Sequence, residues 1–130
     1  MKKFSAIVGL AFVLVGCATP GENMSAADTA ELNAPLYCNN ETQCKNVWER
    51  ATYYVSTNSG YKIQNINNNL IETYNSPSPD TKLTWRILKK PLGNGRYQIV
   101  TSAWCGNVFG CYPDNYEAIL AAKRYMKEGL

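Results

Sequence analysis

The spacing of apolar residues changes along this chain, and the change predicts the order of its structural elements. Before Gly60, apolar residues recur three or four positions apart with charged residues between them, which is typical of an amphipathic helix. The apolar face of this helix comprises Cys44, Val47, Trp48, Ala51, Tyr54 and Val55. Asn40 is the expected N-cap, and Gln43 can reach back toward the cap. We expect the helix to end near Thr57, with Asn58 and Gly60 providing a left-handed termination.

Further along, apolar and polar residues alternate with a period of two, which predicts strands. Residues 61–74 hold two short alternating runs whose parity shifts near 66–69. This pattern fits either two strands joined by a tight turn or one long strand with a bulge. The clearest strands are 82–90 and 96–104, with Gly93-Asn94-Gly95 as the turn between them. The second of these is apolar on both faces near its end, as a central strand would be.

The last predicted element is a helix that starts after Asp114. Asp114 as N-cap with Glu117 three residues later is a capping-box pattern. The residues expected to face the core are Tyr116, Ile119, Leu120 and Met126. Basic residues gather near the C-terminal end, where the helix dipole favours cations: Lys123, Arg124 and Lys127. The predicted fold is α+β, with three or four antiparallel strands in a curved sheet and both helices on one face.

Length and cysteine count indicate one disulfide-stabilised domain. The 130 residues leave room for a single domain, expected over 36–130, which is small enough to benefit from covalent links. Four late cysteines form an even set, enough for two disulfides: Cys38, Cys44, Cys105 and Cys111. Three connectivities are possible. Local pairing within each six-residue spacing is slightly favoured over long-range pairing, because both loops are short and the second contains two glycines.

The N-terminus has the features of an export signal. Lys2 and Lys3 precede the apolar run Ala6–Val15, which is too short to span a bilayer and reads as a signal peptide over 1–16. Its end, Leu14-Val15-Gly16-Cys17, resembles the lipobox of bacterial lipoproteins. The resemblance implies a diacylglycerol on the Cys17 thiol, cleavage before Cys17 and an acyl chain such as palmitate on the freed amine. The alternative is an ordinary signal peptide with an incidental Cys17.

The lipobox resemblance also implies an address in the cell envelope. Two or more acyl chains hold a protein stably on a membrane, whereas one chain does not. Ala18 lacks the Asp that commonly retains Gram-negative lipoproteins at the inner membrane, so outer-membrane anchoring facing the periplasm is expected. Residues 17–35 read as a flexible spacer with a reach of about 25 Å. The alternative there is a short helix over Ala26–Leu32.

Charge and composition argue against several classes of function. Without Lys2 and Lys3 the net charge falls from +3 to about +1, which gives no general attraction to nucleic acid. The chain has no histidine, so Ser-His-Asp and Cys-His catalytic arrangements are excluded, and we expect neither a metal site nor a cofactor. A carboxylate pair is the remaining route to a histidine-free hydrolase, drawn from Glu72, Asp80, Asp114 and Glu117. We expect the protein not to be an enzyme.

Two features suggest binding instead. Basic residues cluster on one predicted hairpin: Lys82, Arg86, Lys89, Lys90 and Arg96. Such a cluster could bind anionic lipid headgroups or an acidic partner. The favoured interpretation is a solvated sheet face that discourages edge pairing. The aromatic residues are Tyr37, Trp48, Tyr53, Tyr54, Trp85, Trp104, Phe109 and Tyr112, and most are expected in the core. Asn107, Phe109 and Tyr112 form the candidate binding site around Cys111. The alternative is that this loop simply packs on the sheet.

These observations predict a membrane-tethered interaction module or accessory subunit of the cell envelope. The segments Cys105-Gly106-Asn107 and Phe109-Gly110-Cys111 resemble small uncharacterised lipoproteins of Gram-negative bacteria, and this resemblance implies no activity. A ligand-binding or inhibitory lipoprotein, which neutralises a toxin or hydrolase, is the first alternative. A histidine-free hydrolase is the second.

Overall fold

The computed structural model describes residues 23–130, and the α+β class predicted from the sequence is confirmed. The predicted signal peptide and lipobox, with Cys17, lie outside the described residues. The helices and strands described are α1 (Ala26–Asn33), β1 (Leu36–Cys38), α2 (Glu41–Asn58), β2 (Ile63–Ile66), β3 (Leu70–Thr73), β4 (Thr84–Gly93), β5 (Arg96–Trp104) and α3 (Asn115–Lys127). Within residues 23–130, no helix combines the length and the apolar character needed to cross a bilayer.

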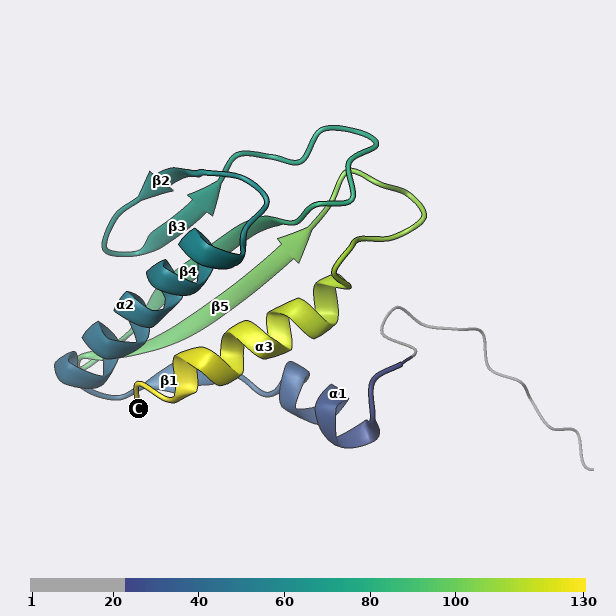
Figure 1. Ribbon diagram of the computed structural model, residues 1–130. Coiled ribbons are helices and arrows are strands. Elements are labelled where there is room, and N and C mark those ends of the chain that lie inside the picture. Colours follow the sequence, from purple (N-terminus) through teal and green to yellow (C-terminus); the bar gives the residue numbers. More distant parts are fainter. Residues whose placement is uncertain (1–22) are drawn as a thin grey trace, which may run out of the picture.

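The strands form one antiparallel sheet in the order β1-β5-β4-β3-β2, with α2 and α3 against one face (Figure 1). The described sheet therefore has five strands, where the sequence predicted three or four. The additional strand is β1, in which Leu36 pairs with Ile99 and Cys38 with Tyr97. As predicted for its apolar end, β5 lies inside the sheet, between β1 and β4.

The hydrophobic core lies between the sheet and the two helices. Strand alternation turns Trp85 and Ile87 toward the helices and Arg86 toward the opposite, open face. Helix α2 contributes its predicted face, and α3 contributes two alanines and a methionine to the core cluster. The main core residues are Val47, Ala51, Val55, Ile71, Trp85, Ile87, Ile99, Ala103, Ala118, Ala122 and Met126.

Local turn chemistry accounts for both hairpins. Asn94 and Gly95 have φ angles of 54° and 73°, which is the two-residue turn whose twist matches that of antiparallel strands. Over 61–74 the two-strand interpretation is correct. The turn between β2 and β3 is held by Asn67 Oδ1, which accepts from the backbone N–H groups of Asn69 (2.8 Å) and Leu70 (3.0 Å).

The predicted helix starts are confirmed. Asn40 Oδ1 accepts from the N–H of Gln43 at 2.9 Å, and Asp114 Oδ1 accepts from the N–H groups of Tyr116 and Glu117 at 3.0 and 3.1 Å. Gln43 reaches back one residue further than expected, to the N–H of Asn39 at 3.0 Å. These bonds satisfy N–H groups that a helix start leaves without internal partners.

The predicted left-handed end of α2 is wrong. The residue after Asn58 is Ser59, which is extended at φ −75° and ψ 144°, and neither Asn58 nor Gly60 is among the positive-φ residues of the described chain. Asn58 instead donates its side-chain Nδ2 to the carbonyl of Tyr54 at 3.0 Å, which satisfies a last-turn acceptor. Gly60 is required for space, because a Cβ there would lie 2.6 Å from the Cβ of Lys82.

Helix α1 corrects the prediction of a flexible spacer up to residue 35. Residues Ala26–Asn33 form the short helix that was the alternative for this stretch, with Ser25 as its N-cap. No residue of α1 is buried, so the hydrophobic effect contributes little to holding it in place. So short a helix is marginal alone, and its attachment to α3 must come from polar contacts.

Basic residues of α3 provide that attachment. Lys123 is only 6% exposed, and its Nζ donates to the carbonyls of Glu31 (3.1 Å), Leu32 (2.7 Å) and Ala34 (2.5 Å) at the end of α1. Lys123 was expected to complement the dipole of its own helix, and instead it caps another one. Arg124 pairs with Asp28 and Glu31, and its hydrogen bonds lower the pKa of both carboxyl groups.

Replacing Lys123 with Met is expected to release α1 from α3. The methionine keeps the apolar stem but removes three charge-assisted hydrogen bonds, so amide protection in α1 should fall at least about tenfold. Hydrogen exchange at the Ala34 amide, which donates to the Ala30 carbonyl, measures this. Lys127→Met is the matched control, because among residues 23–130 the Nζ of Lys127 makes a single ion pair, with Glu31 at 3.5 Å. Equal protection in the Lys123 and Lys127 variants would contradict the assigned role.

Candidate functional site

Both disulfides are local, as the sequence slightly favoured. Cys38 bonds to Cys44 and Cys105 to Cys111, with Cα–Cα distances of 5.1 and 5.7 Å. The first bond ties β1 to the first turn of α2. The second closes residues 105–111, called here the disulfide loop, between β5 and α3. Among the described residues, no group of three or more His, Cys, Asp or Glu side chains is arranged to hold a metal ion.

The disulfide loop is docked on the segment 76–81, which connects β3 to β4. The Gly106 N–H donates to Ser76 Oγ at 3.1 Å, and the N–H of the adjacent Tyr112 donates to the Thr81 carbonyl at 3.0 Å. A Cβ on Gly106 would lie 2.4 Å from the Pro77 carbonyl oxygen. Because that clash would be with backbone, only glycine allows the two segments to approach this closely.

The supporting segment is itself held in place. The Tyr61 hydroxyl donates to the Asp80 carboxylate, and this hydrogen bond lowers the pKa of Asp80. At the other end, the Ser76 N–H donates to Oγ1 of the buried Thr84 at 2.6 Å. The disulfide loop is therefore fixed by its covalent bond and by the segment 76–81, which Tyr61, just before β2, and Thr84 of β4 hold in place.

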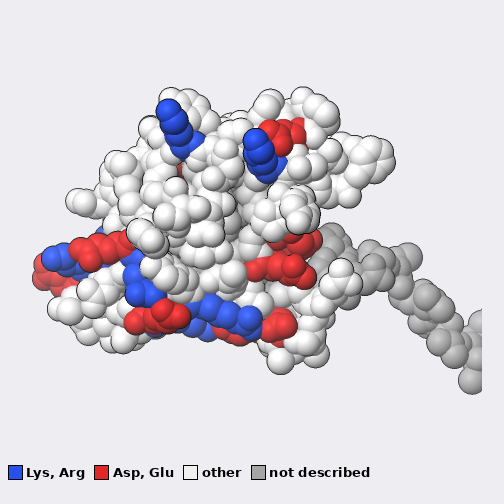
Figure 2. Space-filling view, in the orientation of Figure 1, with Lys and Arg blue, Asp and Glu red and all other residues white. Residues whose placement is uncertain are grey.

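The tip of this loop projects into solvent. Val108 is 92% exposed, Phe109 97% and the neighbouring Tyr112 83%. The alternative that the loop packs on the sheet therefore does not hold for these side chains. In Figure 2, charged side chains gather along the lower edge, over α1 and α3, while the right-hand end where the loop projects is largely uncharged. An exposed aromatic group on a fixed loop is suited to contact a partner.

Asn107 positions this tip. Its Nδ2 donates to the Pro79 carbonyl at 2.7 Å, and its Oδ1 accepts from the Phe109 N–H at 2.9 Å. Both ends of the amide are engaged within the protein, and the side chain is half-buried. Of the three predicted binding residues, Phe109 and Tyr112 are therefore presented to solvent, and Asn107 orients the backbone of Phe109.

Three of the four acids considered for a hydrolase have structural partners. Glu72 pairs with Arg86 at 3.7 Å across β3 and β4. Asp80 accepts a hydrogen bond from a tyrosine hydroxyl, and Asp114 caps α3. Glu117 is exposed in the first turn of α3, and its carboxylate makes no hydrogen bond or ion pair among the described residues.

The predicted basic cluster is wrong as a single patch. Alternation along β4 turns Lys89 toward the helices and Arg86 and Lys90 toward the open face of the sheet. Arg96 donates from Nε to Asn39 Oδ1 at 3.2 Å. Because β4 lies between β3 and β5, guarding a sheet edge is not its role either.

The expectation that most aromatic residues are core is also wrong. Of the eight considered, Trp85 is fully buried, and Trp48 and Tyr54 are half-buried. Strand alternation places Tyr37 and Trp104 on the open sheet face, each 39% exposed. An apolar side chain on a strand is buried only when helices or loops cover the sheet face on which it lies.

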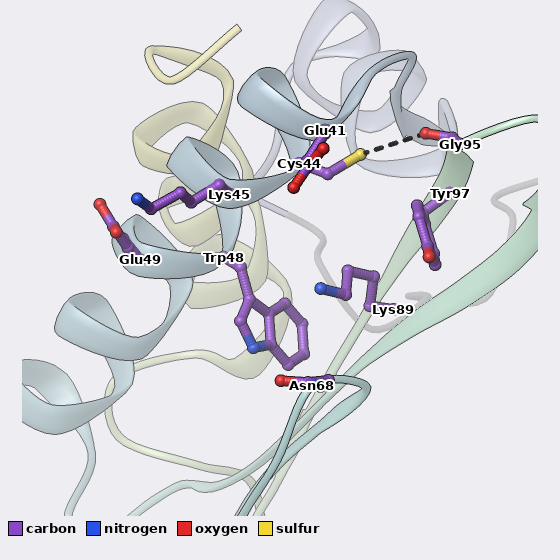
Figure 3. A pocket seen from close by; sticks show the side chains of 9 residues that line it. All are labelled: Glu41, Cys44, Lys45, Trp48, Glu49, Asn68, Lys89, Gly95 and Tyr97. Carbon is purple, nitrogen blue, oxygen red and sulfur yellow. Dashed lines mark hydrogen bonds between the residues drawn. The ribbon is translucent and has the colours of Figure 1, made fainter.

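Sequence reasoning missed a hollow of about 570 Å³ between α2, the turn after β2 and the hairpin of β4 and β5 (Figure 3). We call it the Trp48 hollow. Lys89 lies within it, 5.0 Å from the ring centroid of Trp48 and 5.3 Å from that of Tyr97. Lys89 and Tyr97 lie on the two strands of the predicted hairpin, but Trp48 comes from α2, about forty residues earlier, and no local pattern brings it to them.

A scan against protein-family models and searches of curated proteins and of solved structures found no match to this chain. Function is therefore inferred from this chain's own residues. Two features offer a site: the disulfide loop with its exposed aromatic tip, and the Trp48 hollow.

Proposed function

We propose that this protein is an envelope lipoprotein that captures a protein partner with the tip of its disulfide loop. In this proposal Cys17 carries the lipid anchor, and the absence of Asp at position 18 favours the outer membrane, facing the periplasm. The lipobox resemblance supports the anchor. Two formed disulfides agree with export to an oxidising compartment.

The observation that carries the proposal is the 97% exposure of Phe109 on a loop that is held from both sides. Burying a phenylalanine side chain against a partner is worth about 1.5–3 kcal/mol. A loop already fixed by a disulfide and by Asn107 loses little conformational freedom on binding, so more of that gain is kept as affinity. Tyr112 adds an aromatic ring beside it, with a hydroxyl that can hydrogen-bond at the rim.

The side chains at the tip of the loop indicate what kind of surface the partner presents. Residues 106–110 carry no charge, so the complementary surface is an apolar pocket with few ionic groups. An inhibitory lipoprotein would use the same contact on a toxin or hydrolase. The nature of the captured protein therefore distinguishes an accessory module from an inhibitor.

The test places a photo-crosslinking amino acid at position 109 in cells and recovers adducts from the membrane fraction. In parallel, Phe109→Ala is expected to lower capture of the identified partner at least about tenfold, because exposed aromatic anchors contribute a large share of binding energy. Its melting temperature should change little, since the side chain packs against almost nothing in the domain. Ile66→Ala is the matched control, because Ile66 is 53% exposed on β2.

Each outcome bears on the proposal. A defined adduct from position 109 supports it when Phe109→Ala, tested without the crosslinker, captures the same partner weakly and Ile66→Ala captures it normally. A set of envelope proteins in the adduct favours the accessory module, and a single stoichiometric toxin or hydrolase favours the inhibitor. Undiminished capture by Phe109→Ala, or a large drop in its melting temperature, would contradict a docking role for the loop.

A further inference from the structure

The Trp48 hollow has the dimensions and the walls of a small-ligand site. Its volume of about 570 Å³ lies within the range of about 300–1,000 Å³ usual for ligand pockets. Trp48 from α2 and Tyr97 from β5 supply aromatic walls, and Lys89 from β4 points into the space between them (Figure 3). The hollow shares no residue with the disulfide loop, so ligand binding there is independent of the proposed function.

Lys89 is the unusual group in this hollow. Within the described residues, no carboxylate lies within 4.0 Å of its ammonium, and no hydrogen bond from its Nζ is present. The rings of Trp48 and Tyr97, at 5.0 and 5.3 Å, stabilise the cation only through their quadrupoles. Partial burial lowers the pKa of Lys89. A half-buried ammonium without an anionic partner favours a ligand that carries negative charge.

The walls are held in place before any ligand binds. Trp48 Nε1 donates to the Asn67 carbonyl at 3.2 Å, which ties the indole to the turn between β2 and β3. Asn69 in the same turn exchanges two hydrogen bonds with the backbone of Lys89, at 2.8 and 2.9 Å. The disulfide at Cys44 fixes the first turn of α2. One short turn therefore ties the aromatic wall to the lysine strand, which is the pre-organisation that a binding site needs.

The polar lining indicates the rest of the ligand. Glu41 and Asn68 border the hollow, and so do Lys45 and Glu49. In Figure 3 the side chains of Lys45 and Glu49 point away from Lys89. Carboxylate oxygens accept from hydroxyl groups, and an amide both donates and accepts. Aromatic walls with such groups at the rim suit a pyranose ring, which has an apolar face and a belt of hydroxyls. A nearby carboxylate disfavours a doubly charged group such as phosphate, so a single negative charge is the better match.

From this geometry we propose that the Trp48 hollow binds an acidic sugar, a pyranose with one carboxylate, which pairs with Lys89 while the ring lies against Trp48 or Tyr97. Glu41 accepts hydrogen bonds from the sugar hydroxyls, and Asn68 both donates hydrogen bonds to them and accepts from them. The volume accommodates one or two sugar units.

The test compares three probes on the full-length protein in neutral detergent at low ionic strength, following the indole N–H signal of Trp48 by NMR. Glucuronate has the ring, the hydroxyls and the charge. Glucose lacks the charge, and cyclohexanecarboxylate lacks the hydroxyls. We expect glucuronate to bind with a Kd of about 1 mM and each of the other two at least about tenfold more weakly.

A pair of lysine variants locates the effect. Lys89→Met keeps an apolar side chain between the two rings and is expected to weaken glucuronate binding about tenfold, to the level of glucose. Lys90→Met is the matched control, because Lys90 is exposed on the opposite face of the same strand, and it should leave binding unchanged. If Lys89→Met fails to fold, Lys89→Gln replaces it.

Three results would overturn the inference. Glucuronate binding no tighter than glucose would show that the charge at Lys89 is not used. Equal binding of cyclohexanecarboxylate would show a site for acids rather than for sugars. An equal loss in the Lys89 and Lys90 variants would show general electrostatic attraction. The comparison of the three probes on the unaltered protein is decisive even if neither Lys89 variant folds.

Discussion

Replacing Trp85 with Ala is expected to lower the free energy of unfolding by about 3–5 kcal/mol. Trp85 is 1% exposed and packs edge-on against Tyr54, with ring centroids 5.7 Å apart. It lies on β4, where it pairs with Ala103 of β5. Because β4 is an interior strand covered by both helices, the neighbours cannot move in to fill the space that the indole leaves.

Urea unfolding under oxidising conditions measures this loss, and Trp104 provides the matched control. Trp104 pairs with Thr84 one position further along the same two strands, but lies on the open face and is 39% exposed. Trp104→Ala should cost about 1 kcal/mol or less. A domain of this size is stable by about 5–15 kcal/mol, so the two variants differ by a large share of the total. Equal losses would contradict the assigned covered and open faces.

A conservative variant at the same position separates packing from polarity. The buried Trp85 Nε1 has no hydrogen-bond partner among the described residues. Trp85→Phe keeps an aromatic ring and removes that unsatisfied donor, so part of the lost packing is offset. Its cost in the same urea experiment should therefore be well below that of Trp85→Ala.

Replacing Cys17 with Ser is expected to abolish acylation completely. The lipobox resemblance places the diacylglycerol on this thiol and the second acylation on the amine that cleavage before Cys17 exposes. A hydroxyl at that position is not the nucleophile for the first transfer, so both later steps stop. Metabolic labelling with palmitate, followed by mass spectrometry of the purified protein, reports on both the lipid and the cleavage site.

The matched control removes other sulfurs without touching the lipobox. A double Cys38→Ser, Cys44→Ser variant breaks one disulfide and should keep the label. Retention of palmitate by Cys17→Ser would contradict the anchor, and so would a mature product that begins at another residue. The proposed membrane address fails in either case, while the disulfide loop and the Trp48 hollow remain as described.

Much of the fold could be predicted because its signals are local. Asn40 and Asp114 each bond to backbone groups two or three residues away, and Asn94-Gly95 encodes its turn through positive φ angles. The disulfide loop is local as well, since its two cysteines are six residues apart. That short closure, with Phe109 and Tyr112 beside it, is why the candidate binding loop could be found without a structure.

Elements without an apolar pattern of their own could not be assigned securely. Strand β1 has three residues, too few to show a period, and it is a strand because β5 pairs with it. Helix α1 has no buried face, and its end is capped by Lys123, about ninety positions away in the chain. Alternation along β4 separates Lys89 from Arg86 and Lys90 already in the sequence, but the sequence does not say which of these two faces the helices cover.

Local sequence thus determined where α2 and α3 begin and how the hairpin turns, and it slightly favoured the observed cysteine pairing, because each of those choices is made by atoms a few residues apart. Tertiary packing alone decided which aromatic residues are exposed, where α1 docks and that Trp48 lies against Lys89. Those outcomes depend on contacts between segments separated by tens of residues. The position of each such contact is set by the packing of the whole sheet against α2 and α3.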